Sequence, residues 1–174
     1  MSDTQFETVL TPVSTVSVEQ QPLTISVQSI DQSFYQHVAA GYWAWRAVFE
    51  NDSNARINQH PDFVLTELSF SREVQRHSPT LVICQERSKT VGAAILLPKS
   101  IAGEKKFGPA WNLQGYRLAG NRMLGSSDAR VQHRLLERIS QHLADSKVDF
   151  LLAEDVEATD PLLELVETGA HDLL

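Results

Sequence analysis

Apolar side chains recur with two different periods along this chain, and the period predicts which segments are strands and which are helices. Every second residue from Leu23 to Val27 is apolar, which predicts a first strand. A helix follows, with Asp31 or Ser33 as its N-cap, and it ends in the polar run 51–54. Its apolar face is made of residues spaced three and four apart: Phe34, Val38, Tyr42, Trp45 and Phe49.

Prolines and branched aliphatic residues divide the middle of the chain. Pro61 suits the first turn of a second helix, which we expect to run toward His77. Two segments rich in branched aliphatic residues, 81–86 and 91–97, are typical of strands, and the polar turn 87–90 joins them. The pattern therefore predicts a hairpin that is buried in a sheet.

A glycine-rich loop separates the next predicted strand from the clearest amphipathic helix. The strand covers 111–118 and contains Gly115, which indicates a bulge or a close backbone approach. The helix takes Ser127 or Asp128 as its N-cap and carries apolar residues at helical spacing as far as Leu143. This segment predicts a strand, a loop and a helix in direct succession.

The chain continues with a strand over 148–153 and a short helix that starts at Asp160 and Pro161. The predicted order is β-α-α-β-β-β-α-β-α. An antiparallel meander leads into a strand–loop–helix unit, and a parallel crossover returns the chain to the sheet. The fold class is α/β (α+β), with a mixed, mainly antiparallel sheet flanked by helices.

The loop 120–127 has the composition of a phosphate cradle, with the spacing Arg122-x-x-Gly125-x-Ser127 at its centre. Glycine lets backbone N–H groups approach an anion, and the N-terminus of the following helix adds partial positive charge. The alternative is a tight strand-to-helix connection. Nearby arginines either contact phosphate or are solvated or paired with acidic groups: Arg117, Arg122 and Arg130.

Composition narrows the class of partner. The chain has 174 residues, 42% of them hydrophobic and 21% charged, which suits one globular domain. Its formal charge of −7 argues against general nucleic-acid binding, which needs a basic face. Basic residues gather between 104 and 138, whereas eight acidic residues and no basic one follow from Asp149 onward. The middle of the chain suits a small anion.

Cys84 is the single cysteine and lies in an apolar run, so no disulfide framework is available and a buried, inert thiol is expected. Residues 1–22 lack the basic and apolar regions of a signal peptide, and we interpret them as a mobile leader to a domain over 23–174. No apolar stretch approaches about 20 residues, the length of a membrane span. A cytoplasmic protein without membrane association is predicted.

The order of elements, with a glycine loop between the fourth strand and the third helix, resembles the GNAT acyltransferase superfamily. In that family a Gln/Arg-x-x-Gly-x-Gly/Ala loop wraps the pyrophosphate of an acyl-CoA. The segment 122–127 matches at Arg122 and Gly125 and has Ser127 at the last position. The resemblance implies acyl-CoA (acetyl-CoA) as co-substrate, held by Arg122, Gly125, Ser126 and Ser127, and no metal.

A closer resemblance is to the FemAB-like and cellulose-biosynthesis (CelD-like) branch of that superfamily. It covers about 23–174 and is carried by WRAVFENDSNARINQHPDF, VGAAILLPK and LQGYRLAGNRMLG. That branch has two tandem folds, and this chain resembles the first one, with the final strands missing. The resemblance implies that a second acyltransferase-fold domain or another copy of the chain is a partner.

Two carboxylates are the candidates for catalysis. Glu154 and Asp155 follow the strand beside the implied acyl site, and either could take a proton from an amine nucleophile, or simply be a loop carboxylate. Trp43 and Arg46 are expected to point away from the Tyr42 stripe, which indicates a second contact surface. His60, which precedes a helix start, is the one histidine worth testing.

Two functions remain open from the sequence. The first is transfer of an acyl group from acyl-CoA to an amine, on a sugar or on a precursor of the cell envelope or a polysaccharide. The second is a non-catalytic half-domain that supplies a packing or substrate-side surface to a partner domain or subunit.

Overall fold

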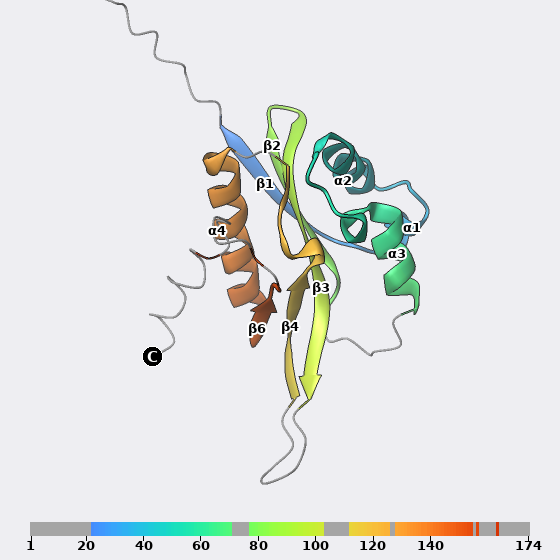
Figure 1. The fold of residues 1–174 in the computed structure, drawn as a ribbon, viewed down its shortest axis with the longest axis vertical. Coiled ribbons are helices and arrows are strands. Elements are labelled where there is room, and N and C mark those ends of the chain that lie inside the picture. The colour runs from blue at the N-terminus through green and yellow to red at the C-terminus, as the bar shows by residue number, and fades with distance from the viewer. Residues whose placement is uncertain are drawn as a thin grey trace, which may run out of the picture.

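The computed structural model describes residues 22–70, 77–102, 112–125, 128–154, 156 and 163. A six-stranded sheet forms its centre, with β1, β2, β3, β4 and β6 hydrogen-bonded in that order and β5 paired with β3 (Figure 1). The pairs from β1 to β4 are antiparallel, and β6 lies parallel to β4. The strands are β1 (Leu23–Ser29), β2 (Thr80–Glu86), β3 (Lys89–Ala102), β4 (Asn112–Leu118), β5 (Leu124–Gly125) and β6 (Phe150–Leu152).

Helices cover both faces of this sheet. The layer that holds α1, α2 and α3 lies on one face, and α4 lies on the other (Figure 1). This arrangement confirms the predicted class, a mixed and mainly antiparallel sheet flanked by helices. The helical segments are α1 (Gln32–Tyr35), α2 (Ala40–Asn51), η1 (Ile57–Gln59), α3 (Pro61–Phe70), η2 (Ala119–Asn121) and α4 (Ala129–Ser146).

The two central strands are apolar on both faces because each face packs against a helical layer. On β2, Leu81 and Ile83 join the core under α2 and α3, while Val82 and Cys84 join the core under α4. The thiol of Cys84 is fully buried, as expected, and burial raises its pKa to about 11. The lack of a two-residue alternation in this segment follows from burial on both sides.

The prediction of one helix from about 31 to 51 is wrong, because the chain turns between α1 and α2. His37 has a left-handed backbone with φ of 57°. The amide of His37 donates to the carbonyl of Phe34 at 3.0 Å, and that of Val38 donates to the carbonyl of Ser33 at 3.0 Å. These two bonds are those of a Schellman motif, which ends a helix. Val38 is 69% exposed and so contributes nothing to the expected apolar face.

The other predicted elements are found with shifted ends. The hairpin turn is only Arg87–Ser88, since β3 begins at Lys89 and continues to Ala102. The strands expected at 111–118 and 148–153 correspond to β4 and β6. The parallel pairing of β4 with β6 confirms the predicted crossover. Three predictions fall outside the described residues: the leader before 22, the second helix over 71–76, and the last helix from Asp160 except for Leu163, which is helical.

Gly115 marks a close backbone approach and not a bulge. The β3–β4 register passes through Lys99 opposite Gly115 without a shift. A Cβ atom built on Gly115 would lie 2.2 Å from the carbonyl oxygen of Phe150, which belongs to the neighbouring β6. Glycine is therefore required here for the parallel strand to reach the sheet.

Asp128 is the N-cap of α4, as one of the two predicted alternatives. Its side chain accepts from the amide of Arg130 at 2.9 Å, and the same arginine holds the pKa of the Asp128 carboxyl below its usual range.

No helix within the described ranges has the length and apolar character needed to cross a membrane.

Candidate functional site

The loop expected to hold an anion is folded onto the sheet. Residues 119–121 form the single turn η2, and Gly125 pairs with Gly92 as part of β5. Gly120 and Gly125 both have positive φ, at 67° and 102°. A Cβ on Gly125 would lie 2.3 Å from the carbonyl oxygen of Val91, so its glycine serves close contact with β3.

The amide of Gly125 has an anionic partner within the protein. It donates to Asp52 Oδ2 at 2.8 Å, and this contact is partly buried. Asp52 is the C-cap residue of α2, and its other oxygen, Oδ1, accepts from the amide of Asn54 at 2.9 Å. A protein carboxylate therefore lies where the resemblance places a pyrophosphate oxygen.

Arg122 is turned along the loop and contacts backbone carbonyls. Its Nη1 donates to the carbonyl of Asn54 at 3.3 Å, and its Nε donates to the carbonyl of Met123 at 3.4 Å. Through these contacts the side chain joins the loop to the segment after α2. The two remaining predicted cofactor contacts, Ser126 and Ser127, lie outside the described residues.

Gln59, the last residue of η1, forms hydrogen bonds that support the loop. Its side chain is fully buried, its Nε2 donates to the carbonyl of Arg122 at 2.9 Å, and its Oε1 accepts from the amide of Arg56 at 3.0 Å. The backbone carbonyl of Gln59 accepts from Trp45 Nε1 at 2.8 Å. Both Nε2 and Oε1 of the Gln59 side chain are therefore hydrogen-bonded within the protein. Together with the bond from Trp45, they hold the loop against α2 and η1.

The other candidates from the sequence are dispersed. Glu154 is exposed and follows the end of β6, whereas Asp155 lies outside the described residues. Arg117 and Arg130 form ion pairs with Glu67 and with Asp128, the second at 2.7 Å. Both arginines are therefore paired with acidic residues, which is one of the predicted alternatives. Glu67 and Asp128 lie earlier in the chain than the acidic segment that starts at Asp149.

Trp43 points away from the buried stripe of α2, as predicted, but the prediction is wrong for Arg46, whose side chain interacts with Tyr42 one helical turn away. Tyr42 is fully buried, while Trp43 is 53% exposed and lies 5.9 Å from the guanidinium carbon of Arg46. His60 is a helix-start residue: its Nδ1 accepts from the amide of Asp62 at 3.2 Å, and its ring meets that of Phe49 edge-on.

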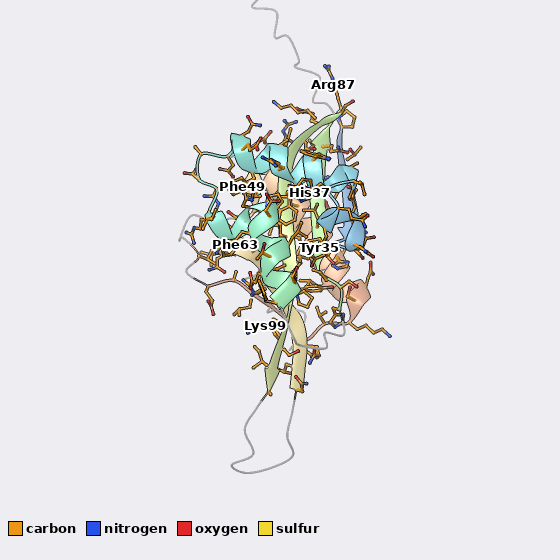
Figure 2. All side chains as sticks on the ribbon, turned by 90° about the vertical axis from the view of Figure 1, so that its right-hand side faces the viewer. Tyr35, His37, Phe49, Phe63, Arg87 and Lys99 are labelled. Atoms are coloured by element: carbon orange, nitrogen blue, oxygen red, sulfur yellow. The ribbon has the colours of Figure 1, made fainter. Side chains whose placement is uncertain are left out.

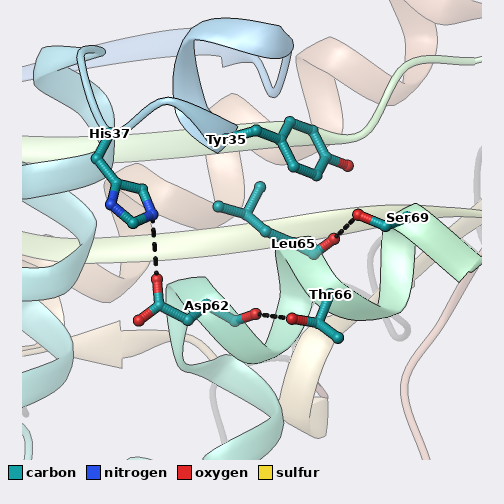
Figure 3. Close-up of a pocket in the computed structure, with 6 residues that line it drawn as sticks. All are labelled: Tyr35, His37, Asp62, Leu65, Thr66 and Ser69. Atoms are coloured by element: carbon teal, nitrogen blue, oxygen red, sulfur yellow. Dashed lines mark hydrogen bonds and ion pairs between the residues drawn. The ribbon is translucent and has the colours of Figure 1, made fainter.

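A second group of polar side chains lies on the helical layer, at an open hollow of about 270 Å³. Tyr35 and His37 come from α1 and the turn after it, and both lie on the face turned to the viewer in Figure 2. The opposite side of the hollow belongs to α3 (Figure 3). Four residues of α3 also line it: Asp62, Leu65, Thr66 and Ser69.

Asp62 is held by aromatic neighbours. The hydroxyl of Tyr42 donates to Asp62 Oδ1 at 2.7 Å, and His37 Nε2 lies 3.6 Å from the same oxygen (Figure 3). The rings of His37 and Tyr42 are stacked with centroids 4.3 Å apart. Burial, and then the bond to Asp62, raise the pKa of the Tyr42 hydroxyl, so that hydroxyl stays a donor. This side-chain group orients the carboxylate at the edge of the hollow.

Comparison with models of protein families, with curated proteins and with solved structures gave no match. The acyltransferase resemblance therefore stays a prediction.

Few local patterns in the chain indicate the residues that the structure brings together. Asp52 belongs to the polar run that ends α2, and such a run indicates only where a helix ends. Gln59 resembles a surface residue by type. His37 lies at a position where its neighbours fit a continuous helix. Only the Asp62 position carries a local signal, since a carboxylate in the first turn favours a helix start.

Proposed function

We propose that this chain is a non-catalytic half-domain with an N-acyltransferase-like fold, which serves as a packing or substrate-side module for a partner domain or subunit. The hydrogen bond from the Gly125 amide to Asp52 carries the proposal. A pyrophosphate at this amide would have to displace a carboxylate that already accepts from two backbone amides. It would also meet a like charge, which opposes its binding.

The contacts of Arg122 support the same conclusion. Its guanidinium donates to two backbone carbonyls of the loop and of the segment after α2. A phosphate-binding arginine uses its donors on the ligand. Here the described donors hold the protein together, so the cation contributes to the structure of the loop.

The edge of the sheet supports a packing role. Within the described ranges, no strand pairs with the outer side of β6, the last strand in the sheet order. An unpaired edge presents backbone donors and acceptors to any strand that can add to it. A partner domain or subunit can complete the sheet at this position.

One observation favours the second candidate, an acyltransferase that moves an acyl group from acyl-CoA to an amine of a sugar or a cell-envelope or polysaccharide precursor. β4 and β6 are parallel neighbours, and the loop and α4 lie between them in the chain. In this alternative, Arg122 and the loop amides hold pyrophosphate, and Glu154 or Asp155 takes the proton of the amine.

Isothermal titration of the full chain with acetyl-CoA separates the two candidates. For a non-catalytic module we expect no saturable heat up to about 1 mM acetyl-CoA. Arg122→Ala is the matched variant, because it removes the one cation of the predicted motif. A Kd below about 100 µM in the native chain, weakened about tenfold or more by Arg122→Ala, would overturn the proposal in favour of the transferase.

A further inference from the structure

The hollow between the α1 turn and α3 presents hydrogen-bond acceptors. The hydroxyl of Thr66 donates to the carbonyl of Asp62 at 2.7 Å, and that of Ser69 donates to the carbonyl of Leu65 at 2.8 Å (Figure 3). Each hydroxyl has one proton, and that proton is already used within α3. Both side chains can therefore offer only oxygen lone pairs to a molecule in the hollow.

Asp62 adds a fixed negative charge to these acceptors. Among the described residues it is the one carboxylate that lines the hollow, and its side chain is 49% exposed. The bond from Tyr42 holds one of its oxygens in place, while His60 Nδ1 lies 4.0 Å from the other. Arg46 on α2 pairs with Glu50 at 2.8 Å and also interacts with the side chain of Tyr42, the residue that donates to Asp62.

Among the described residues, the rest of the lining is one apolar side chain and two aromatic rings that each carry a polar group. Leu65 is buried and lies between the two walls, and the rings of Tyr35 and His37 lie on the opposite side from α3 (Figure 3). Such a lining suits the short hydrocarbon part of a ligand. The face of the Tyr35 ring also attracts cations, which adds to the effect of the carboxylate.

We propose that this hollow binds a small organic ammonium group, either a free primary alkylamine or the side chain of a lysine. An ammonium has three N–H donors and no acceptor, which complements the Asp62 carboxylate and the hydroxyl oxygens of Thr66 and Ser69. The site uses none of the residues of the Gly125 loop. It therefore holds whether or not the chain binds acyl-CoA.

The test is a two-dimensional NMR titration of the full chain, following the backbone amides of α3. The probes are n-butylammonium chloride, a lysine blocked at both its amino and carboxyl ends, tetramethylammonium chloride and sodium butyrate, at matched ionic strength. We expect one or both ammonium probes to shift the amides of Leu65, Thr66 and Ser69 saturably, with a Kd of about 1–10 mM. The tighter of the two identifies the source of the ammonium.

Tetramethylammonium and butyrate are the controls for the ligand. The first carries the charge without N–H donors, and the second carries the opposite charge on a similar hydrocarbon chain. Each should bind at least about tenfold more weakly than n-butylammonium, because neither satisfies the acceptors. Equal binding of either control would overturn the proposal, and so would the absence of a saturable shift for both ammonium probes.

Asp62→Asn and Glu137→Gln are the matched variants. Each removes one negative charge, but Glu137 pairs with Arg134 on α4, across the sheet from the hollow. Asp62→Asn should weaken ammonium binding about tenfold or more, whereas Glu137→Gln should leave it unchanged. His37→Gly removes the ring on one side of the hollow and keeps a backbone that glycine favours. It should weaken binding a few-fold, because the hydrocarbon part of the ligand loses a contact surface. Unchanged affinity in Asp62→Asn would contradict the proposal.

Discussion

At the scale of single residues, a few polar groups decide the shape of the loop. Asp52 and Gln59 belong to the segment around α2 and η1, yet they hold the amide of Gly125 and the carbonyl of Arg122. Their hydrogen bonds span more than sixty residues of sequence. The loop is therefore a tertiary structure, and its own composition does not determine its conformation.

Gly120→Ala should destabilise the protein by about 2–3 kcal/mol. The position has φ of 67°, and a Cβ would lie 2.4 Å from Cγ of Gln59. Urea unfolding of the single variants and of the double variant Gln59→Ala/Gly120→Ala measures the effect. Because the clash needs Gln59, the double variant should lose less stability than the sum of the two single variants. Simple additivity would show that Gln59 does not occupy this space.

His142 should make the stability of the protein depend on pH below neutrality. Its Nε2 is buried and lacks a hydrogen-bond partner among the described residues, and burial, followed by the charge of Arg138, lowers its pKa from 6.5. The unfolded chain therefore takes up this proton at a higher pH than the folded chain. The contribution of neutral His142 to the free energy of unfolding is fully present above about pH 6.5 and decreases as the pH falls toward 5.

Urea unfolding at pH 7 and pH 5 tests this linkage, with His142→Phe as the comparison. Phenylalanine keeps a ring against Tyr116, whose centroid lies 5.7 Å from that of His142, and it does not titrate. The variant should lose less stability between the two pH values than the native chain does. An equal loss in both proteins would assign the pH dependence to other groups.

At the scale of elements, the α1–α2 break shows where periodicity misleads. Phe34, Tyr42 and Trp45 all reach the core, as the pattern predicts, but they do so from two helices. The left-handed residue at the break is a histidine, and local rules expect glycine or asparagine there. A pattern of apolar residues records burial, and it is silent about a turn whose residue type is unusual.

The conformation of His37 gives a second stability test. His37→Gly should change the free energy of unfolding by less than about 1 kcal/mol, since relief of the backbone offsets the lost ring contact. His37→Val should cost about 2 kcal/mol, because a β-branched side chain opposes positive φ. Thermal or urea unfolding measures both. Similar losses in the two variants would show that the left-handed backbone is not populated in solution.

At the scale of the whole molecule, much of the architecture was predictable, and the loop was not. The strands from β1 to β4 and helix α4 follow from runs of apolar residues and from the cap at Asp128. The parallel return to β6 follows from the order of elements. The state of the loop depends on Asp52 and Gln59, whose contacts are non-local. Sequence patterns report local preferences, so they identify a glycine motif without showing what fills it.

The contact between β4 and β6 should limit how the sheet is completed. Gly115→Ala would place a methyl group 2.2 Å from the carbonyl oxygen of Phe150. Since β6 pairs with β4, we expect this variant to release β6 and to cost about 2–4 kcal/mol. Hydrogen exchange of the Phe150, Leu151 and Leu152 amides should accelerate more than that of β2. Uniform acceleration would mean that β6 unfolds only with the whole sheet.

The amide proton of Gly125 reports most directly on whether Asp52 occupies the predicted anion position of the loop. In two-dimensional NMR of the native chain, its resonance should stay in place as acetyl-CoA is added. In Asp52→Asn the same resonance should move upfield, because the charge-assisted hydrogen bond is weakened. A saturable shift of Gly125 with acetyl-CoA in the native chain, or no change in Asp52→Asn, would show that Asp52 does not hold this amide.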